Sequence, residues 1–247
     1  MIFMEQKERI TNYWNKRSRS FAELRQEEIE SPMGKLWSKE LTRNIPSDKK
    51  LKILDVGTGA GFFSILLSKM GHEVTGVDFS NEMIPEARQL SLKYEVDVDF
   101  YTMDAENLAF PDKTFDVVLS RNLTWTLTNP EKAYSQWLSV LKKGGILLNF
   151  DAEYSKERFS HTSRLLPKEH AHHQIDQELL EECDAINKTL PLGHKSRPEW
   201  DLHVLEMLGC NEITVDKTIS NRIYTEINSF YNPTPMFLIK AVKSERS

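Results

Sequence analysis

The sequence predicts an α/β fold: a doubly wound, mostly parallel sheet of seven strands with helices on its faces. From Lys52 onward, short runs of β-branched and aliphatic residues alternate with longer amphipathic segments, as in the strand–helix units of a parallel sheet. The centre of residues 115–120 is an unbroken Val-Val-Leu run, which is typical of a strand buried on both faces. Glycines and prolines stand where such units turn and where their helices begin or end.

Two helices are expected before this core. The first ends before Ser31-Pro32 and the second runs to about Arg43, after which residues 46–50 form a polar linker. We therefore expect residues 1–50 to be a helical cover and residues 51–247 to form the main domain.

Five short apolar runs account for the first strands of the sheet. They lie at residues 52–56, 73–77, 98–103, 115–120 and 146–150. The helices between them are marked by their ends. Gly71 can supply the left-handed residue that ends a helix at 62–70, and Ser80 or Asn81 can cap the next helix, which runs to about Tyr94. Asn129-Pro130 places a cap and a first-turn proline at the start of a helix to about 141, which residues 142–145 end.

The regular alternation stops after the fifth strand. Residues 153–196 contain no strand pattern and are rich in His, Glu and Lys, with one helix expected at about 174–187. Regular structure resumes at Arg197-Pro198, where a first-turn proline opens a short helix that Gly209 closes. The last two strand-like runs, the final one antiparallel, are 212–219 and 235–242. We interpret 153–196 as a helical insertion that forms a lid over the site.

Composition and charge exclude several classes of protein. Residues 1–50 carry 11 Lys and Arg against 8 Asp and Glu, a net charge of +3, and the whole chain of 247 residues carries −5, which leaves −8 for the remainder. Nucleic-acid binding needs clustered bases, so we expect no nucleic-acid partner. No apolar run reaches the length of a membrane span, charges fill the N-terminus where a signal peptide is apolar, and two cysteines without a C-x-x-C spacing fit a reducing compartment. We expect no membrane partner and a cytoplasmic monomer or homodimer.

The most informative stretch is the glycine-rich turn of residues 54–62, Leu-Asp-Val-Gly-Thr-Gly-Ala-Gly-Phe. Glycines after a strand let the backbone approach a ligand, although they also occur in plain tight turns. A dinucleotide fingerprint needs a small residue where this chain has Phe62. Asp55 would repel a pyrophosphate but suits an amine, and Asp78 can accept both ribose hydroxyls. A nucleoside linked to an amino acid satisfies both acids, and NAD does not.

Five segments in order resemble the motifs of class I S-adenosylmethionine-dependent methyltransferases, and more closely those of the small-molecule branch with a ubiquinone/menaquinone-methyltransferase-like core. They lie at 54–61, 77–83, 104–111, 115–116 and 141–145. The resemblance covers residues 51–152 and, more loosely, 197–242. It implies a Rossmann-like methyltransferase fold and S-adenosylmethionine as the cofactor. The Asn-Pro-Pro-Tyr signature of many exocyclic-amine methylases is absent, which argues against DNA adenine or protein glutamine as the acceptor.

The resemblance also implies cofactor contacts. The glycine turn would hold the methionine part, with Asp55 near its ammonium group, and Asp78 would hold the ribose. Side chains after the second and third strands would contact the adenine, and residues 120–125 would run beneath the sulfonium. The implied cofactor-binding residues are Asp55, Gly57, Thr58, Gly59, Gly61, Asp78, Phe79, Met83, Asp104, Ala105, Glu106 and Arg121.

Methyl transfer is an in-line displacement that depends on positioning and exclusion of water, so no catalytic triad is expected. The candidate catalytic residues are Arg121, Asp151 and Tyr13. Arg121 can pair either with a carboxylate of the acceptor or with an acid of the protein. Asp151 follows the fifth strand and either faces the acceptor or caps a loop. Tyr13 lies in a segment that resembles the one folding over the cofactor in this branch.

Aromatic, basic and imidazole side chains outside the core motifs are the candidates for substrate binding: Trp14, Arg17, Trp125, His170 and His173. The rings can close the site and meet the sulfonium through cation–π contact, or only pack a helix. In the insertion, residues 170–173 (His-Ala-His-His) and Asp176 give pairs at helical spacing, His170 with His173 and His172 or His173 with Asp176. Two histidines and a carboxylate can bind Zn, Ni or Fe. A polar, partly solvated lid is the alternative interpretation, and we predict no resident metal.

We therefore expect an enzyme that binds S-adenosylmethionine and methylates a small, polar metabolite. Two alternatives stay open at this point. One is an NAD(P)-dependent oxidoreductase, and the other is a non-catalytic protein that keeps the cofactor-binding fold as a scaffold.

Overall fold

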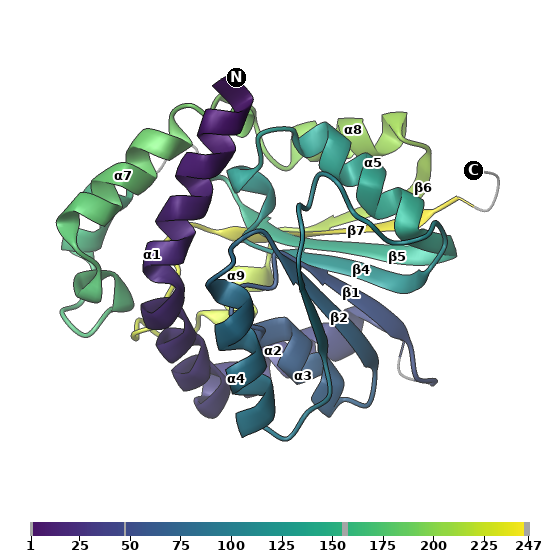
Figure 1. Cartoon of the computed structure of the whole chain (residues 1–247), viewed down its shortest axis with the longest axis horizontal. Helices are drawn as coiled ribbons and strands as arrows, with labels where there is room; N and C mark the ends of the chain where they lie inside the picture. Colours follow the sequence, from purple (N-terminus) through teal and green to yellow (C-terminus); the bar gives the residue numbers. More distant parts are fainter. Residues whose placement is uncertain (1, 47, 155–157, 245–247) are drawn as a thin grey trace.

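The computed structural model of the chain describes residues 2–46, 48–154 and 158–244 (Figure 1). The expected N-terminal cover and insertion extend over residues outside this part, namely Met1, Ser47 and 155–157, as does the main domain over 245–247. A central sheet runs through the described residues, with helices on both of its faces (Figure 1). No helix among the described residues is long and apolar enough to span a membrane.

Seven strands form the sheet, in the order β3-β2-β1-β4-β5-β7-β6. Their bounds are β1 Lys52–Val56, β2 Glu73–Asp78, β3 Asp99–Thr102, β4 Phe115–Arg121, β5 Leu141–Ala152, β6 Cys210–Asp216 and β7 Met236–Lys243. The first five pair in parallel, and β7 runs antiparallel between β5 and β6. The doubly wound, mostly parallel sheet with an antiparallel last strand is thus confirmed. The strand order reverses between β1 and β4, and α/β proteins bind ligands at such a point.

Helices enclose the sheet and extend beyond one end of it (Figure 1). Their bounds are α1 Ile2–Glu30, α2 Pro32–Asn44, α3 Phe62–Lys69, α4 Met83–Lys93, α5 Pro130–Val140, α6 Phe159–Thr162, α7 Gln177–Asn187, α8 Glu199–Met207 and α9 Ile219–Ile223. The expected caps are present: the Ser80 hydroxyl accepts a hydrogen bond from Met83 N at 3.1 Å, and Asn129 accepts one from Lys132 N at 3.0 Å. Gly71 adopts φ +91°, as the end of α3 requires.

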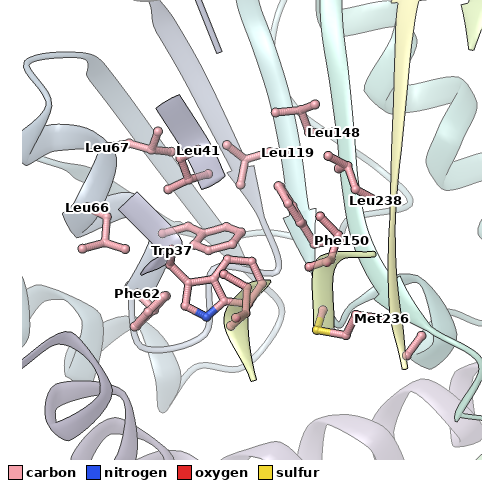
Figure 2. Close-up of a cluster of buried hydrophobic side chains, with 14 of the residues drawn as sticks. Trp37, Leu41, Phe62, Leu66, Leu67, Leu119, Leu148, Phe150, Met236 and Leu238 are labelled. Atoms are coloured by element: carbon pink, nitrogen blue, oxygen red, sulfur yellow. The ribbon is translucent and has the colours of Figure 1, made fainter. Parts of the chain in front are cut away.

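Side chains of the strands alternate between two apolar cores. On β1, Ile53 belongs to the core that contains Trp37 of α2, whereas Leu54 belongs to the core that contains Trp137 of α5. Figure 2 shows the first of these cores, in which Trp37 meets the ring of Phe150 edge-on with centroids 5.6 Å apart. Burial of these large rings fixes α2, and with it the end of α1, against the sheet.

Two boundaries differ from the sequence prediction. Residues 142–145 were expected to end the helix before a strand at 146–150, but β5 begins at Leu141 and includes them, with a register shift between Phe115 and Val117 of β4. The predicted strand 212–219 ends early, at Asp216. There the Asp216 carboxylate accepts hydrogen bonds from the amide and hydroxyl of Thr218 and so turns the chain into α9.

The helix α1 joins the sheet to the insertion. It packs against α4 and α7. On the sheet side, the Ser80 hydroxyl donates a hydrogen bond to Asn15 Oδ1 at 2.6 Å, and on the insertion side the Arg9 guanidinium holds Glu182 of α7 at 2.6 Å. The long first helix is therefore tied at both sides of the space that it crosses.

Candidate active site

A cavity of about 300 Å³ lies at the carboxyl ends of the parallel strands. The glycine turn, the ends of β2 and β4 and residues 103–106 form its floor. The inner face of α1, parts of the insertion and residues 229–234 close it from the other side. Segments far apart in the sequence thus enclose one space.

The glycine turn presents bare backbone to this cavity. Gly57 and Gly59 have φ of +69° and +53°, which disfavour a side chain. A Cβ at Gly57 would lie 2.7 Å from the side chain of Leu123, and one at Gly59 would lie 2.9 Å from the ring of Phe21. Gly61 does not line the cavity; it adopts φ +84° at the start of α3 and packs against Phe100.

Asp55 organises the turn from beneath. Its Oδ2 accepts hydrogen bonds from the hydroxyls of Thr58 and Ser64, each at 2.7 Å, and from Ser64 N at 3.1 Å. Among the described residues, no group donates to its other oxygen. Burial raises the pKa of Asp55 to about 6, and these hydrogen bonds only partly oppose that rise.

Asp78 ends β2 and faces the same cavity. Its two oxygens accept hydrogen bonds from Gly59 N and Ser80 N, each at 2.9 Å, which fixes the carboxylate between the two loops. Burial raises the pKa of Asp78 as well. Next to it, the ring of Phe79 is largely exposed at 42% and Met83 is buried, and both line the cavity.

The acids after β3 are held by the N-terminal helix. Lys7 Nζ lies 2.7 Å from Asp104 and 2.6 Å from Glu106. Burial would lower the pKa of Lys7, but hydrogen bonds to these two carboxylates outweigh it and raise the pKa. Glu106 also accepts hydrogen bonds from Thr128 and Asn129. It therefore binds the segment before α5 as well as Lys7. Ala105 lines the cavity beside them.

Arg121 lies in the cavity wall and pairs with an acid of the protein, the second of the two expected possibilities. Its Nη2 lies 2.8 Å from Glu28 of α1, and its guanidinium stacks 4.3 Å from the ring of Trp37. Burial would lower the pKa of Arg121, but the charge of Glu28 raises it. Arg25 pairs with the same Glu28, so two guanidinium groups share one carboxylate.

Asp151 does not line the cavity, contrary to the expectation that it faces the acceptor. Its Oδ2 lies 2.8 Å from Arg197 and accepts a hydrogen bond from Trp125 N at 3.2 Å. The side chain is fully buried, so these two partners replace solvent. The alternative expectation, a carboxylate that holds a loop, describes what the structure contains.

Of the expected substrate-binding residues, Trp14, Arg17, Trp125 and His170 line the cavity, and so does Tyr13. His173 does not. It is exposed, and its ring bonds the carbonyl of Leu166, because the histidines lie on the short 3-10 helix Ala171–Gln174 rather than on an α-helix. Among the residues that the structure describes, no group of three or more His, Cys, Asp and Glu side chains is arranged to hold a metal ion.

Several lining residues were not among the site residues expected from the sequence: Lys7, Arg25, Tyr154, Phe159, His172 and Tyr224, of which His172 had been named only in the histidine pattern. One pattern could have identified Arg25, since Arg17, Phe21 and Arg25 recur every four residues and so share a helix face. Tyr154, Phe159, His172 and Tyr224 come from the insertion and C-terminal segments, which reach the cavity only through the fold, and Lys7 meets its two acids across about 100 positions.

The sheet order, the glycine turn and the acids at the strand ends together define a class I S-adenosylmethionine-dependent methyltransferase domain. Residues 54–149 match a family model described as a methyltransferase domain. Residues 54–149 therefore form a methyltransferase domain of the class I S-adenosylmethionine-dependent type, similar to those of the small-molecule branch, and S-adenosylmethionine is the cofactor of such a domain.

Curated relatives agree with this assignment. The chain is 38% identical over 96 residues to phosphatidylethanolamine N-methyltransferase of Cereibacter sphaeroides (38% of this chain, 47% of the relative). It is 31% identical over 133 residues to the ubiquinone biosynthesis O-methyltransferase of Xanthomonas campestris pv. campestris (51% of this chain, 55% of the relative). The aligned parts thus amount to about half the length of these relatives.

Solved structures share the fold. The crystal structure of YcgJ from Bacillus subtilis has a TM-score of 0.55 at 21% identity. The alignment covers 86% of this chain and 98% of the YcgJ chain. A second structure is phosphoethanolamine N-methyltransferase 2 of Haemonchus contortus in complex with S-adenosyl-L-methionine, with a TM-score of 0.59 at 19% identity. The alignment covers 85% of this chain and 52% of that chain.

Proposed function

We propose that this protein is an S-adenosylmethionine-dependent methyltransferase whose acceptor is a small, polar metabolite. One observation carries the proposal: a single cavity joins the glycine turn and the strand-end carboxylates to a chamber of aromatic and basic side chains under α1 and the insertion. The first part suits a cationic nucleoside, and the second leaves room for another small molecule. A transfer between two bound molecules needs both in one enclosed space.

The sheet side of the cavity fits the cofactor. Gly57 and Gly59 leave backbone open where a side chain has no room. The hydrogen bonds to Asp55 converge on Oδ2, which leaves Oδ1 for an ammonium group. Asp78 is fixed by two amides and retains lone pairs for ribose hydroxyls, and the exposed ring of Phe79 offers a surface for the adenine.

The bound cofactor supplies a methyl group on a sulfonium, which makes that carbon electrophilic. The protein's part is then to position the acceptor and to exclude water. Trp125, Tyr154 and Phe159 form a wall of tilted rings with centroids 5.3–5.8 Å apart. On the opposite side, the ion pairs of Lys7 with Asp104 and Glu106 hold α1 over the cavity. Burial raises the pKa of Tyr13 far above its ordinary value, so we assign it a hydrogen-bonding role as the protonated phenol and not the role of a base.

Calorimetry with S-adenosylhomocysteine and with NAD tests the cofactor assignment. We expect the homocysteine analogue to bind and NAD not to bind. Transfer of radiolabelled methyl from S-adenosylmethionine to a panel of small metabolites then tests the activity. Binding of NAD without binding of S-adenosylhomocysteine would contradict the proposal, and binding without transfer to any member of a broad panel would favour a non-catalytic scaffold.

A further inference from the structure

Apart from Lys7, which pairs with Asp104 and Glu106, the positive and negative charges of the cavity wall form separate groups. Four carboxylates line it, and all come from the sheet side: Asp55, Asp78, Asp104 and Glu106. Three guanidinium groups also line it, Arg17 and Arg25 from α1 and Arg121 from the end of β4, and we call them the guanidinium cluster. The cofactor is a cation and fits the acidic side. The basic side faces the chamber that we assign to the acceptor.

The guanidinium cluster contains more positive charge than the protein neutralises. Arg25 and Arg121 share the single carboxylate of Glu28. The Nε atoms of both arginines are buried without a hydrogen-bond partner among the described residues. Glu28 therefore offsets one of three charges in the cluster.

Arg17 is the member without any acidic partner. Its side chain is buried, with the residue 7% exposed, yet no carboxylate lies within 4.0 Å of it in the part of the chain that the structure describes. Its Nε and Nη1 are buried and donate no hydrogen bond to any of those residues. A buried charge without a counter-charge is costly to the folded state. Such a group in a cavity wall is positioned for a ligand.

The surroundings of Arg17 place it on the acceptor side. Arg17 lines the cavity together with Tyr13, Cys183 of α7 and His172, and its charge acts on all three. From His172 the wall continues to Phe159 and Trp125, with ring centroids 6.3 Å and 5.6 Å apart. The charge of Arg25 also acts on His172, but its guanidinium lies 4.7 Å from the ring of Phe21, which covers Gly59 in the glycine turn.

We propose that Arg17 anchors an anion subsite, and that the methyl acceptor is a small organic acid. Its carboxylate or phosphate group meets the free N–H groups of Arg17, and its apolar, planar body lies along Phe159 and Trp125. This inference rests on the proposed function, since it names the acceptor class of the same site. Guanidinium groups bind both kinds of anion through paired, charge-assisted hydrogen bonds.

The test uses the full chain saturated with S-adenosylhomocysteine and three probes of similar shape: benzoate, phenyl phosphate and benzamide. We expect at least one anion to bind about tenfold or more tightly than neutral benzamide, as loss of a charged hydrogen bond predicts. Benzoate as the tighter anion assigns a carboxylate, and phenyl phosphate as the tighter one assigns a phosphate. Anions that bind no better than benzamide, or no probe binding at all, overturn the proposal.

Variants connect the preference to Arg17. In Arg17→Gln the preference for the anion should disappear, and in Arg17→Lys part of it should remain. Arg19→Gln is the matched control, because Arg19 lies on the same helix with its side chain exposed. A preference that persists in Arg17→Gln contradicts the proposal. If Arg17→Gln does not fold, the same comparison is made with Arg17→Lys. Full retention of the anion preference in Arg17→Lys at every ionic strength would contradict a bidentate contact.

The same variants separate this inference from the proposed function. S-adenosylhomocysteine should bind wild type and Arg17→Gln equally, and the ligand-free Arg17→Gln protein should melt no lower than wild type, because it loses an unpaired charge. Failure of the wild type to bind S-adenosylhomocysteine refutes the proposed function. Binding of S-adenosylhomocysteine without an anion preference refutes only the anion subsite.

Discussion

Two groups of buried charges in this molecule differ in how completely their members are paired. The first, which we call the Arg197 network, consists of Arg197, Asp151, Asp201 and Tyr134. Arg197 bonds Asp201 through Nε and Nη2 at 2.8 and 2.7 Å and Asp151 through Nη1 at 2.8 Å, and the Tyr134 hydroxyl donates to Asp201 at 2.6 Å. Every side-chain N and O atom of this network that is buried has a partner. The second is the guanidinium cluster, with one carboxylate for three cations.

This difference distinguishes a group of charges that stabilises the fold from a group that is available to bind a ligand. The Arg197 network lies between β5 and α8, away from the cavity, and its complete pairing holds the loop with Trp125 in place. The guanidinium cluster lies in the cavity wall, and its unpaired N–H groups give it no comparable stabilising role. A satisfied buried network rigidifies a fold, whereas an unsatisfied one in a cavity is open to a ligand. The two groups should therefore respond differently to mutation and to added anions.

The largest effect is expected from Arg197→Met. The substitution leaves Asp151 and Asp201 buried without their cation, so we expect the free energy of unfolding to fall by about 3–5 kcal/mol. Chemical denaturation measures this change. Lys217→Met, which breaks an exposed pair with Glu199, should change it by about 0.5 kcal/mol or less. Equal losses in the two variants would remove the basis for regarding the Arg197 network as structural.

Glu28→Gln should have the next largest effect. The amide keeps the shape of the side chain and an oxygen for Trp37 Nε1, but it leaves three guanidinium groups without a counter-charge. We expect a loss of about 2–3 kcal/mol. Added phosphate or benzoate should recover part of it in this variant and none in Arg197→Met, because ligands stabilise only the state that binds them. Recovery of both variants, or of neither, would contradict the comparison.

On the acidic side of the cavity, Asp78→Ala should weaken binding of S-adenosylhomocysteine by about 1–3 kcal/mol, through loss of charge-assisted hydrogen bonds. Calorimetry measures the change. The control is Glu82→Ala, an exposed acid in the following loop that makes no side-chain cap contact and should bind as wild type does. Unchanged affinity in Asp78→Ala would place the ribose elsewhere.

The smallest effect concerns pH. Because the pKa of Asp55 is raised to about 6, its charge is lost as the pH falls through that value. We expect affinity for S-adenosylhomocysteine to decrease from pH 7 to pH 5, by up to about tenfold per pH unit, and Asp55→Asn to flatten the profile. The sign for stability is opposite: the folded state holds its proton more tightly than the unfolded chain, so ligand-free protein loses stability as pH rises from about 4 to 6. An affinity that is independent of pH in wild type would exclude ionised Asp55 as the partner of the ammonium group.

The sequence predicted the parts of the site that depend on neighbours along the chain. Asp55 and Asp78 lie at the carboxyl ends of β1 and β2, and the glycine turn follows β1. Parallel strands bring their carboxyl ends to one edge, so these residues meet whatever the rest of the fold does. The interpretation failed where it assumed local regularity. His173 was expected to share a helix face with His170, but a 3-10 helix presents His172 to the cavity instead.

The sequence by itself therefore determined the sheet, the order of its motifs and the side of the site that receives the cofactor, because periodicity, caps and glycines act over a few residues. Only the tertiary structure decided which charges pair. Asp151 meets Arg197 across 46 positions, and Arg121 meets Glu28 across 93. Arg17 is left without an acid among the described residues. Partners for buried charges are chosen by packing, since the cost of burial depends on what surrounds a charge and not on its place in the chain.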